Sequence, residues 1–400
     1  MIRIIIFELK KLFRNRLTFI MLVILSILNI YHIYDDYAKD VGQEKQYYNA
    51  YFDVYEDVSG EWNAEKINFV TSEYEKAKAV VDTGNFSTES DQPGTHTGYV
   101  FGDYGLFNKI RTEMETLYHY DDAMEEITRK AADNAVFYQQ KENPYLAKLN
   151  QKIESAYQNR SVSAFYDTFG LTEYFKYDFS TLLIMILLIP LLSPLFAKEH
   201  EIEMFSLLKL TPNFQKLSFC KLSAGAIAVC IVTLIFLLED FLMFTYLYHI
   251  SGLSQPIYTL SEFFYSPLTV SIGTYILMNA ALKLLAFLVL GGICMAVSSV
   301  VKNEILPFCC SNAVSLILVL TDAFVENSVV SVFNPVTLLS SGKLFKEFHV
   351  ISMFGTPVYI FWLPMLLAVL ELIVLSILTI MMSTNTIRRH CCQRRCRNEI

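Results

Sequence analysis

The sequence is short of charge, and a long polar stretch of it contains no cysteine. Only 18% of the 400 residues are Asp, Glu, Lys or Arg, whereas 53% are hydrophobic and 14% are aromatic. All eight cysteines lie outside residues 36–177: Cys220, Cys230, Cys294, Cys309, Cys310, Cys391, Cys392 and Cys396. The polar stretch must therefore hold together without disulfides, which favours a bacterial cell surface over a eukaryotic one.

The signatures of several enzyme classes are also missing. The sequence contains no Gly-x-x-x-x-Gly-Lys-Ser/Thr phosphate loop, no Gly-x-Ser-x-Gly elbow and no His-Glu-x-x-His pair. His200 begins the zinc pattern but lacks its second histidine, so we expect no metal site. Cys391, Cys392 and Cys396 are candidates for acylation or metal binding, and an unmodified, reduced tail is the simpler interpretation. We therefore expect a chain that is not an enzyme, has no cofactor and does not hydrolyse ATP by itself.

Hydrophobic runs are the main feature that is present. A helix needs about 18 or more apolar residues to cross roughly 30 Å of hydrocarbon. The first run, 17–35, is predicted to be retained as a span because no small-residue cleavage site follows it. Five more spans are predicted at Phe179–Ala197, Lys221–Tyr248, Ser271–Val301, Ile305–Phe324 and Pro357–Met382. The fold class predicted is an all-α polytopic membrane protein with six transmembrane helices.

Residues 1–16 precede the first span and have a different pattern. Apolar residues recur there at helical spacing, and five basic residues supply the polar side. This pattern predicts an amphipathic helix that lies along the inner leaflet.

The charge distribution predicts the orientation. Residues 35–178 contain 27 acidic and 14 basic residues, so the rest of the chain has 13 acidic and 18 basic residues. Residues 250–270 contain no Lys or Arg, whereas residues 1–16, 198–221 and the tail 383–400 are basic. By the positive-inside rule, both termini are cytoplasmic and 36–177 is extracellular. The separation into two compartments argues against a nucleic-acid-binding protein.

The acidic segment 36–177 is predicted to be helical. Its apolar residues step by three and four in two stripes, and Asn143-Pro144 has the chemistry of a helix start. We expect a helical hairpin or small bundle with a loop over 82–103. The aromatic residues Tyr47, Tyr48, Tyr51, Phe52 and Tyr55 are interpreted as core, with a substrate-gripping surface as the alternative.

The loop 196–221 is the most informative segment. It predicts an amphipathic helix on the inner surface, with Glu199, Glu201, Glu203 and Lys209 exposed and Pro212 at its end. A charged helix at this corner would suit the docking of a soluble partner.

Here the sequence resembles the permease subunit of an ATP-binding-cassette exporter, the six-span class with the type V fold. That class has Phe-x-x-Glu-x-x-x-Gly, a Leu-Leu pair, a Pro and a later Lys in this loop. The matching residues are Phe196, Glu199, Leu207, Leu208, Pro212 and Lys221, with Glu203 in place of the Gly. The start of the chain from Phe7 and the segment Asn334-Pro-Val-Thr-Leu-Leu are also similar to the family. The resemblance covers 1–34 and 179–382 and leaves out the acidic domain.

The resemblance implies specific partners. Two permease copies or paralogues would pair in the lipid bilayer, and each would dock a separate ATPase that holds ATP and Mg²⁺. The implied docking residues are Glu8, Lys11, Arg14, Phe196, Glu199, Glu203, Leu207 and Pro212.

Four ionisable residues lie inside the predicted spans. Such residues are costly in hydrocarbon and generally face protein or water. Glu239 and Lys283 fall at similar depths, so an interhelical ion pair is the first interpretation and a role in substrate passage the second. Asp240 and Glu371 are further candidates for the pathway.

Three functions are compatible with these features. The first is a permease that exports a peptide, an antimicrobial or a lipid-like compound. The alternative is a sensor or immunity protein whose extracellular domain binds a ligand without transport. An intramembrane enzyme that uses Glu239, Asp240 or Glu371 is the third.

Overall fold

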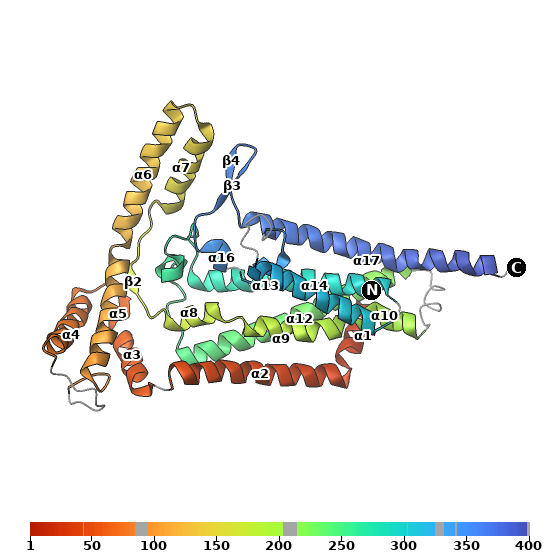
Figure 1. The fold of residues 1–400 in the computed structure, drawn as a ribbon, viewed down its shortest axis with the longest axis horizontal. Coiled ribbons are helices and arrows are strands. Elements are labelled where there is room, and N and C mark those ends of the chain that lie inside the picture. Colours follow the sequence, from red (N-terminus) through yellow and green to blue (C-terminus); the bar gives the residue numbers. More distant parts are fainter. Residues whose placement is uncertain are drawn as a thin grey trace.

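The computed structural model describes residues 1–42, 44–84, 94–202, 214–301, 303–324, 332–340 and 342–397, with no side chain described at 214 or beyond 383. Within these residues, six helices are long and apolar enough to cross a membrane, as the sequence predicts: Arg16–Asp40, Phe169–Glu201, Gln215–Tyr248, Ile272–Val300, Ile305–Phe324 and Trp362–Ser383. Six such helices indicate a membrane protein. A mainly helical domain lies at one end of the bundle, and both termini lie toward the other end (Figure 1). We call these the domain end and the terminal end.

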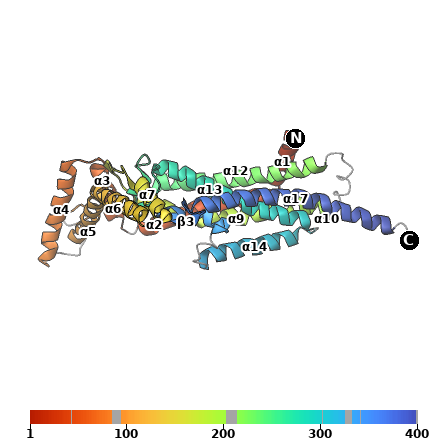
Figure 2. The same ribbon diagram turned by 90° about the horizontal axis from the view of Figure 1, so that it is seen from above.

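The bundle is built from nine α-helices along the described chain. They are α1 (Ile2–Phe13), α2 (Arg16–Asp40), α8 (Phe169–Lys176), α9 (Phe179–Leu192), α10 (Pro194–Glu201), α12 (Phe214–Tyr248), α13 (Ile272–Val300), α14 (Ile305–Phe324) and α17 (Trp362–Arg397). Short elements connect them at the domain end: η1 (Ile257–Thr259), η2 (Ser261–Phe263), η3 (Pro335–Leu338), α16 (Gly342–Phe345), β3 (Val350–Met353) and β4 (Thr356–Tyr359). Figure 2 shows α12 and α14 on opposite sides of α13 and α17.

Local sequence explains several helix ends. The side chain of Asn15 accepts a hydrogen bond from the backbone N–H of Leu17 at the start of α2, and Ser271 caps α13 in the same way. α9 ends at Leu192, and α10 begins at Pro194, where the missing N–H costs nothing.

Several boundaries differ from the sequence predictions: for example, the third span, predicted from Lys221, begins at Gln215. The sixth span was predicted from Pro357, but Pro357 lies in β4, which pairs antiparallel with β3, and the helix begins at Trp362. The surface helix predicted over 196–212 ends at Glu201 in the described structure, and Glu203, Leu207, Lys209 and Pro212 lie outside the described residues.

The domain between α2 and α9 is mainly helical, as predicted. Its helices are α3 (Lys45–Val58), α4 (Ala64–Asp82), α5 (Val100–Tyr118), α6 (Tyr120–Gln140) and α7 (Pro144–Tyr157). The strands β1 (Gly60–Glu61) and β2 (Ala164–Phe165), which the periodicity did not predict, pair antiparallel. Asn143 caps α7 and Pro144 occupies its first turn, as the sequence indicated.

Aromatic residues form the core of this domain. Tyr51 and Tyr55 are almost fully buried, with ring centroids 4.4 Å apart, which confirms the core interpretation of this stripe. The hydroxyl of Tyr51 donates to Asp167 (2.7 Å) and that of Tyr55 donates to Glu113 (2.5 Å). The ammonium of Lys109 lies 4.7 Å from the centroid of the Tyr51 ring. Two half-buried carboxylates therefore border this core beside one cation.

Arg160 fixes the domain to the bundle. Its buried guanidinium donates to the carbonyl of Ser266 (2.8 Å), which follows η2, and to the hydroxyl of Tyr120 (3.2 Å). The Tyr120 ring stacks on that of Tyr258 in η1 at 4.8 Å. Lys152 on α7 donates to the carbonyl of Pro357 in β4 (2.8 Å). The contacts join two domain helices to two separate connections of the bundle.

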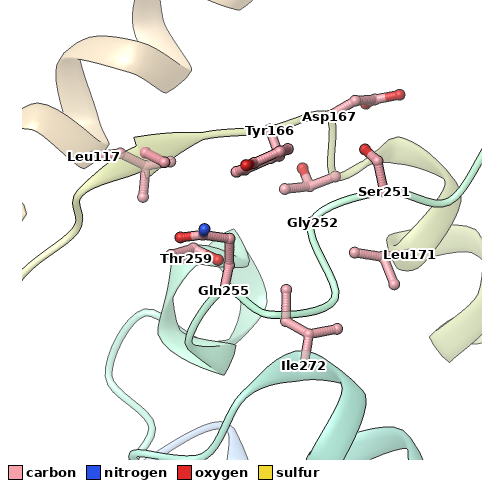
Figure 3. A pocket seen from close by; sticks show the side chains of 11 residues that line it. Leu117, Tyr166, Asp167, Leu171, Ser251, Gly252, Gln255, Thr259 and Ile272 are labelled. Carbon is pink, nitrogen blue, oxygen red and sulfur yellow. The ribbon is translucent and has the colours of Figure 1, made fainter. Parts of the chain in front are cut away.

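A narrow pocket lies at this junction, between the segment after β2 and the loop that precedes α13. Figure 3 shows Tyr166 and Asp167 on one side and Gly252 and Gln255 on the other. Gly252 has φ +68°, and a Cβ atom there would come within 3.0 Å of Tyr166. Glycine is therefore required both by the backbone conformation and by the close approach of the domain.

The two half-buried carboxylates, Glu113 and Asp167, make the domain sensitive to pH. Burial raises the pKa of Glu113 and of Asp167, although the tyrosine hydrogen bonds oppose that shift. Because the folded state then holds these protons more tightly than the unfolded state, their stabilising contribution is complete below the unfolded pKa. That contribution is lost as pH rises through the folded pKa.

We therefore expect the unfolding temperature of the domain to fall between about pH 4 and neutral pH. In Glu113→Gln the fall should be smaller, because a neutral amide still accepts the Tyr55 hydrogen bond without titrating. Near-ultraviolet circular dichroism of the full chain in detergent follows the tyrosine core during heating. Glu115→Gln, an exposed change on the same helix, is the control, and identical pH profiles for wild type and Glu113→Gln would contradict the assignment.

Candidate functional site

Three helices meet in a cluster of opposite charges at the terminal end of the bundle. We call Glu8, Lys11, Glu199 and Lys221 the corner cluster. Glu8 and Lys11 come from α1, Glu199 from α10 and Lys221 from α12, so residues far apart in sequence converge on one point. The i, i+3 spacing of Glu8 and Lys11 places both on one face of α1.

Glu199 is the centre of the corner cluster. One of its carboxylate oxygens accepts hydrogen bonds from Lys221 (2.5 Å) and from Lys11 (3.0 Å). Lys221 also donates to the carbonyl of Leu195 (3.2 Å), and its ammonium lies 5.6 Å from the Phe196 ring centroid. Glu8 lies 3.7 Å from both lysines.

Three of the four residues of the corner cluster are buried. Lys221 is 2% exposed, Glu8 4% and Glu199 6%, whereas Lys11 reaches the surface. Partial burial by itself lowers the pKa of Lys11, but the hydrogen bond and charge of Glu199 outweigh it and the net pKa is raised. Two acids and two bases balance in charge, which is the condition under which buried ions are tolerated.

The exposure predicted for Glu199 is therefore wrong. Helical periodicity placed it on the solvent face, but α10 packs against α13, and the charge of Glu199 is satisfied by Lys11 of α1 and Lys221 of α12. Among the described docking candidates, Glu8, Phe196 and Glu199 are buried and only Lys11 and Arg14 are exposed. The burial of the acids had a sequence signal, since Lys221 opens an apolar run in which an ammonium needs a partner.

α13 contacts the backbone where α9 ends and α10 begins. The hydroxyl of Ser298 donates to the carbonyl of Ser193 (2.6 Å) and accepts from the backbone N–H groups of Phe196 (3.1 Å) and Ala197 (3.2 Å). The break between α9 and α10 is thus satisfied by one side chain of a neighbouring helix, as a buried backbone requires. α10 is therefore bonded to residues of α1, α12 and α13.

A second polar group lies inside the bundle. Asn29 on α2 donates to Asp240 on α12 (2.8 Å) and accepts from the hydroxyl of Tyr177 (2.8 Å). Asn29 and Asp240 are almost fully buried. Sequence reasoning selected Asp240 but missed Asn29, although an amide within an apolar run of α2 was a visible signal.

The remaining intramembrane candidates do not come together. Within the described residues no ion pair joins Glu239 to Lys283, and one carboxylate oxygen of Glu239 is buried without a hydrogen-bond partner. Lys283 instead lines a cavity at the domain end. Glu371 on α17 is half-buried. The predicted Glu239–Lys283 pair is therefore not formed.

The corner cluster predicts a large effect for one substitution. Glu199→Ala leaves the ammonium of Lys221 buried without its principal anion, which costs about 3–5 kcal/mol of unfolding free energy. The measurement is thermal and denaturant unfolding of the purified chain in detergent.

The exposed Glu125 on α6 supplies the control, and Glu125→Ala should change the unfolding free energy by less than about 0.5 kcal/mol. The double variant Glu199→Leu with Lys221→Met should recover most of the lost unfolding free energy, because two buried apolar side chains do not need an oppositely charged partner. A single variant as stable as wild type would show that the cluster does not hold the corner.

The corner cluster, the Ser298 contacts and the Asn29 group are binding and positioning arrangements. Within the described residues no group of three His, Cys, Asp or Glu side chains is arranged to hold a metal ion. In comparisons with known proteins, no protein-family model and no curated protein matches the chain. The assignment of a function therefore rests on the geometry of the chain itself.

Proposed function

We propose that this chain is the permease subunit of an ATP-binding-cassette exporter, which forms the translocation path and docks a separate ATPase. The observation that carries the proposal is the corner cluster. It connects two short helices at the terminal end, α1 and α10, to the long spanning helix α12. An ATPase that moved either short helix would act directly on a helix that crosses the bilayer.

The charge distribution supports the topology of this proposal. The terminal end contains the basic residues of α1, and the described loop between α12 and α13 at the domain end contains no Lys or Arg. The positive-inside rule then assigns the terminal end to the cytoplasm and the acidic domain to the outside. α1 exposes Ile2, Ile6 and Phe7, which suits a helix that lies in the inner leaflet.

The proposed coupling is ordinary linkage. A partner shifts a conformational equilibrium only if it contacts the two states differently. Because Glu199 bridges α1 and α12, a displacement of α10 must either move both helices or break buried ionic hydrogen bonds. Breaking the buried ionic hydrogen bonds costs several kcal/mol of free energy, so the three helices are expected to move together.

The proposed docking surface differs from the residue set that the family resemblance implies. Since Glu8, Phe196 and Glu199 are buried, they position the surface and are not available for contact. The exposed end of α10 offers Lys198, Glu201 and Ile202 instead, and α1 offers Lys11 and Arg14. Ile202, 53% exposed beside two charged residues, is the apolar anchor that this surface provides.

The proposal is tested by affinity purification of the tagged chain from its native membrane. An ATPase with a phosphate loop should copurify with wild type, and Ile202→Glu should reduce its recovery by about tenfold, because a charge in an apolar anchor position costs at least 1.4 kcal/mol of binding.

Phe354→Glu is the matched control for this experiment. Phe354 is the fully exposed tip of the β3–β4 hairpin, at the domain end of the molecule (Figure 1). Recovery of the ATPase should be unchanged in that variant. If wild type recovers no such ATPase, the permease proposal fails.

A groove in the domain favours the second candidate function, a ligand sensor without transport. It measures about 370 Å³ and lies between α4 and α5, lined by Ile67, Val70, Arg111, Met114, Tyr118 and His119 among others. Such a groove is large enough for a small ligand or a short peptide. A ligand response that persists in cells without the ATPase would favour the sensor over the permease.

A further inference from the structure

A cavity at the domain end contains a buried lysine that has no partner. Lys283 lies on α13, about 16 Å along the helix axis from its first residue. It is 8% exposed, and within the described residues no hydrogen bond or ion pair is formed by its ammonium. Burying an ammonium in this way is unfavourable unless an anion or another acceptor approaches it.

The cavity beside Lys283 is large enough to admit such an anion. Its volume is about 220 Å³, and it lies between the start of α9, η2, α13 and α16. The other three lysines that line it already have acidic partners: Lys176 pairs with Glu173 (2.9 Å), Lys343 with Asp322 (3.6 Å) and Lys346 with Glu262 (2.7 Å). Lys283 is the exception among them.

One wall of the cavity is aromatic. Phe175, Phe263 and Tyr275 contact one another, with ring centroids 5.0 to 6.1 Å apart, and Leu339 continues the apolar surface. A ligand that fits this cavity therefore has an anionic group for the lysines and an apolar part for the rings. Lysine binds phosphate as a point charge, so phosphate is a suitable anionic group for this cavity.

Asp178 is the native competitor for Lys283. It also lines the cavity, and its side chain does not cap α9, although Asp178 is the residue that precedes that helix. The two groups attract each other through space, but no ion pair joins them in the described structure. An incoming phosphate would gain from Lys283 and lose from Asp178, so the two residues should act in opposite directions.

We propose that this cavity is a binding site for a phosphate group. Lys283 is the buried cation that contacts the phosphate, and the aromatic wall contacts an apolar group attached to it. The phosphate is carried by a lipid headgroup or is free in solution. The site does not depend on an ATPase or on transport, and so goes beyond the proposed function.

The test uses the full chain in a maltoside detergent, which contains no phosphate. Two probes are titrated by calorimetry: a short-chain phosphatidylglycerol and inorganic phosphate. We expect saturable binding of at least one probe to wild type. Tighter binding of the phosphatidylglycerol assigns the lipid as the source, and equal or tighter binding of inorganic phosphate assigns the free ion.

Three variants determine whether Lys283 is responsible. Lys283→Met should weaken binding by about tenfold or more, the value of a charge-assisted hydrogen bond. Asp178→Asn should tighten it, because the competing anion is gone. Lys216→Met, an exposed lysine at the start of α12 at the terminal end, removes the same charge from the molecule and should leave binding unchanged.

The proposal is overturned if neither probe binds wild type, or if Lys283→Met binds as wild type does. Thermal unfolding of each variant shows whether it is folded. If Lys283→Met does not fold, Asp178→Asn decides, and an affinity equal to that of wild type in that variant would also overturn the proposal.

Discussion

The cost of burying charge organises the terminal end of this protein. Lys221 lies at the start of a spanning helix and is almost completely removed from water, so its ammonium needs an anion within hydrogen-bonding distance. Glu199 supplies that anion, and Lys11 and Glu8 complete a neutral set. Because the four residues come from α1, α10 and α12, satisfying one charge also fixes the positions of three helices. The Ser298 hydroxyl completes the same corner from α13 by satisfying the backbone at the α9–α10 break.

The domain end is organised by a different interaction, the packing of aromatic rings around one guanidinium. Arg160 stacks against the rings of Tyr157 and Tyr258 and donates to the carbonyl of Ser266. These contacts attach the domain to loops of the bundle and not to the spanning helices themselves. The domain also contacts the bundle directly, since Tyr48 and Tyr51 of α3 pack on Phe169 of α8. A ligand bound in the domain would therefore act on the helices through α8 as well as through the connection between α12 and α13 and the β3–β4 hairpin.

Sequence periodicity was sufficient where one environment dominates a whole segment. Apolar runs identified the six long helices, because a spanning helix needs a minimum length of continuous hydrophobic side chains. Three- and four-residue steps identified the buried positions Val70, Tyr74, Ile110 and Met114 in the domain. Periodicity was insufficient at Glu199, because it gives the direction of a side chain on its own helix and not what covers that helix. The start of the sixth span was misplaced for a related reason: the apolar residues around Pro357 suit a strand of a hairpin as well as a helix.

The sequence by itself determined the class of the protein, its six long apolar helices, the separate acidic domain and the absence of disulfides within that domain. These properties follow from composition and local pattern, which need no knowledge of distant contacts. Only the tertiary structure decided which charges meet. It paired Glu199 with Lys221 and Asp240 with Asn29, and it left Lys283 in a cavity without a partner. Polar partners must approach within a few ångströms, and the periodicity of a helix does not predict which helices lie next to it. Partners 22 or 211 residues apart in sequence are therefore identified only when the packing of the helices is known.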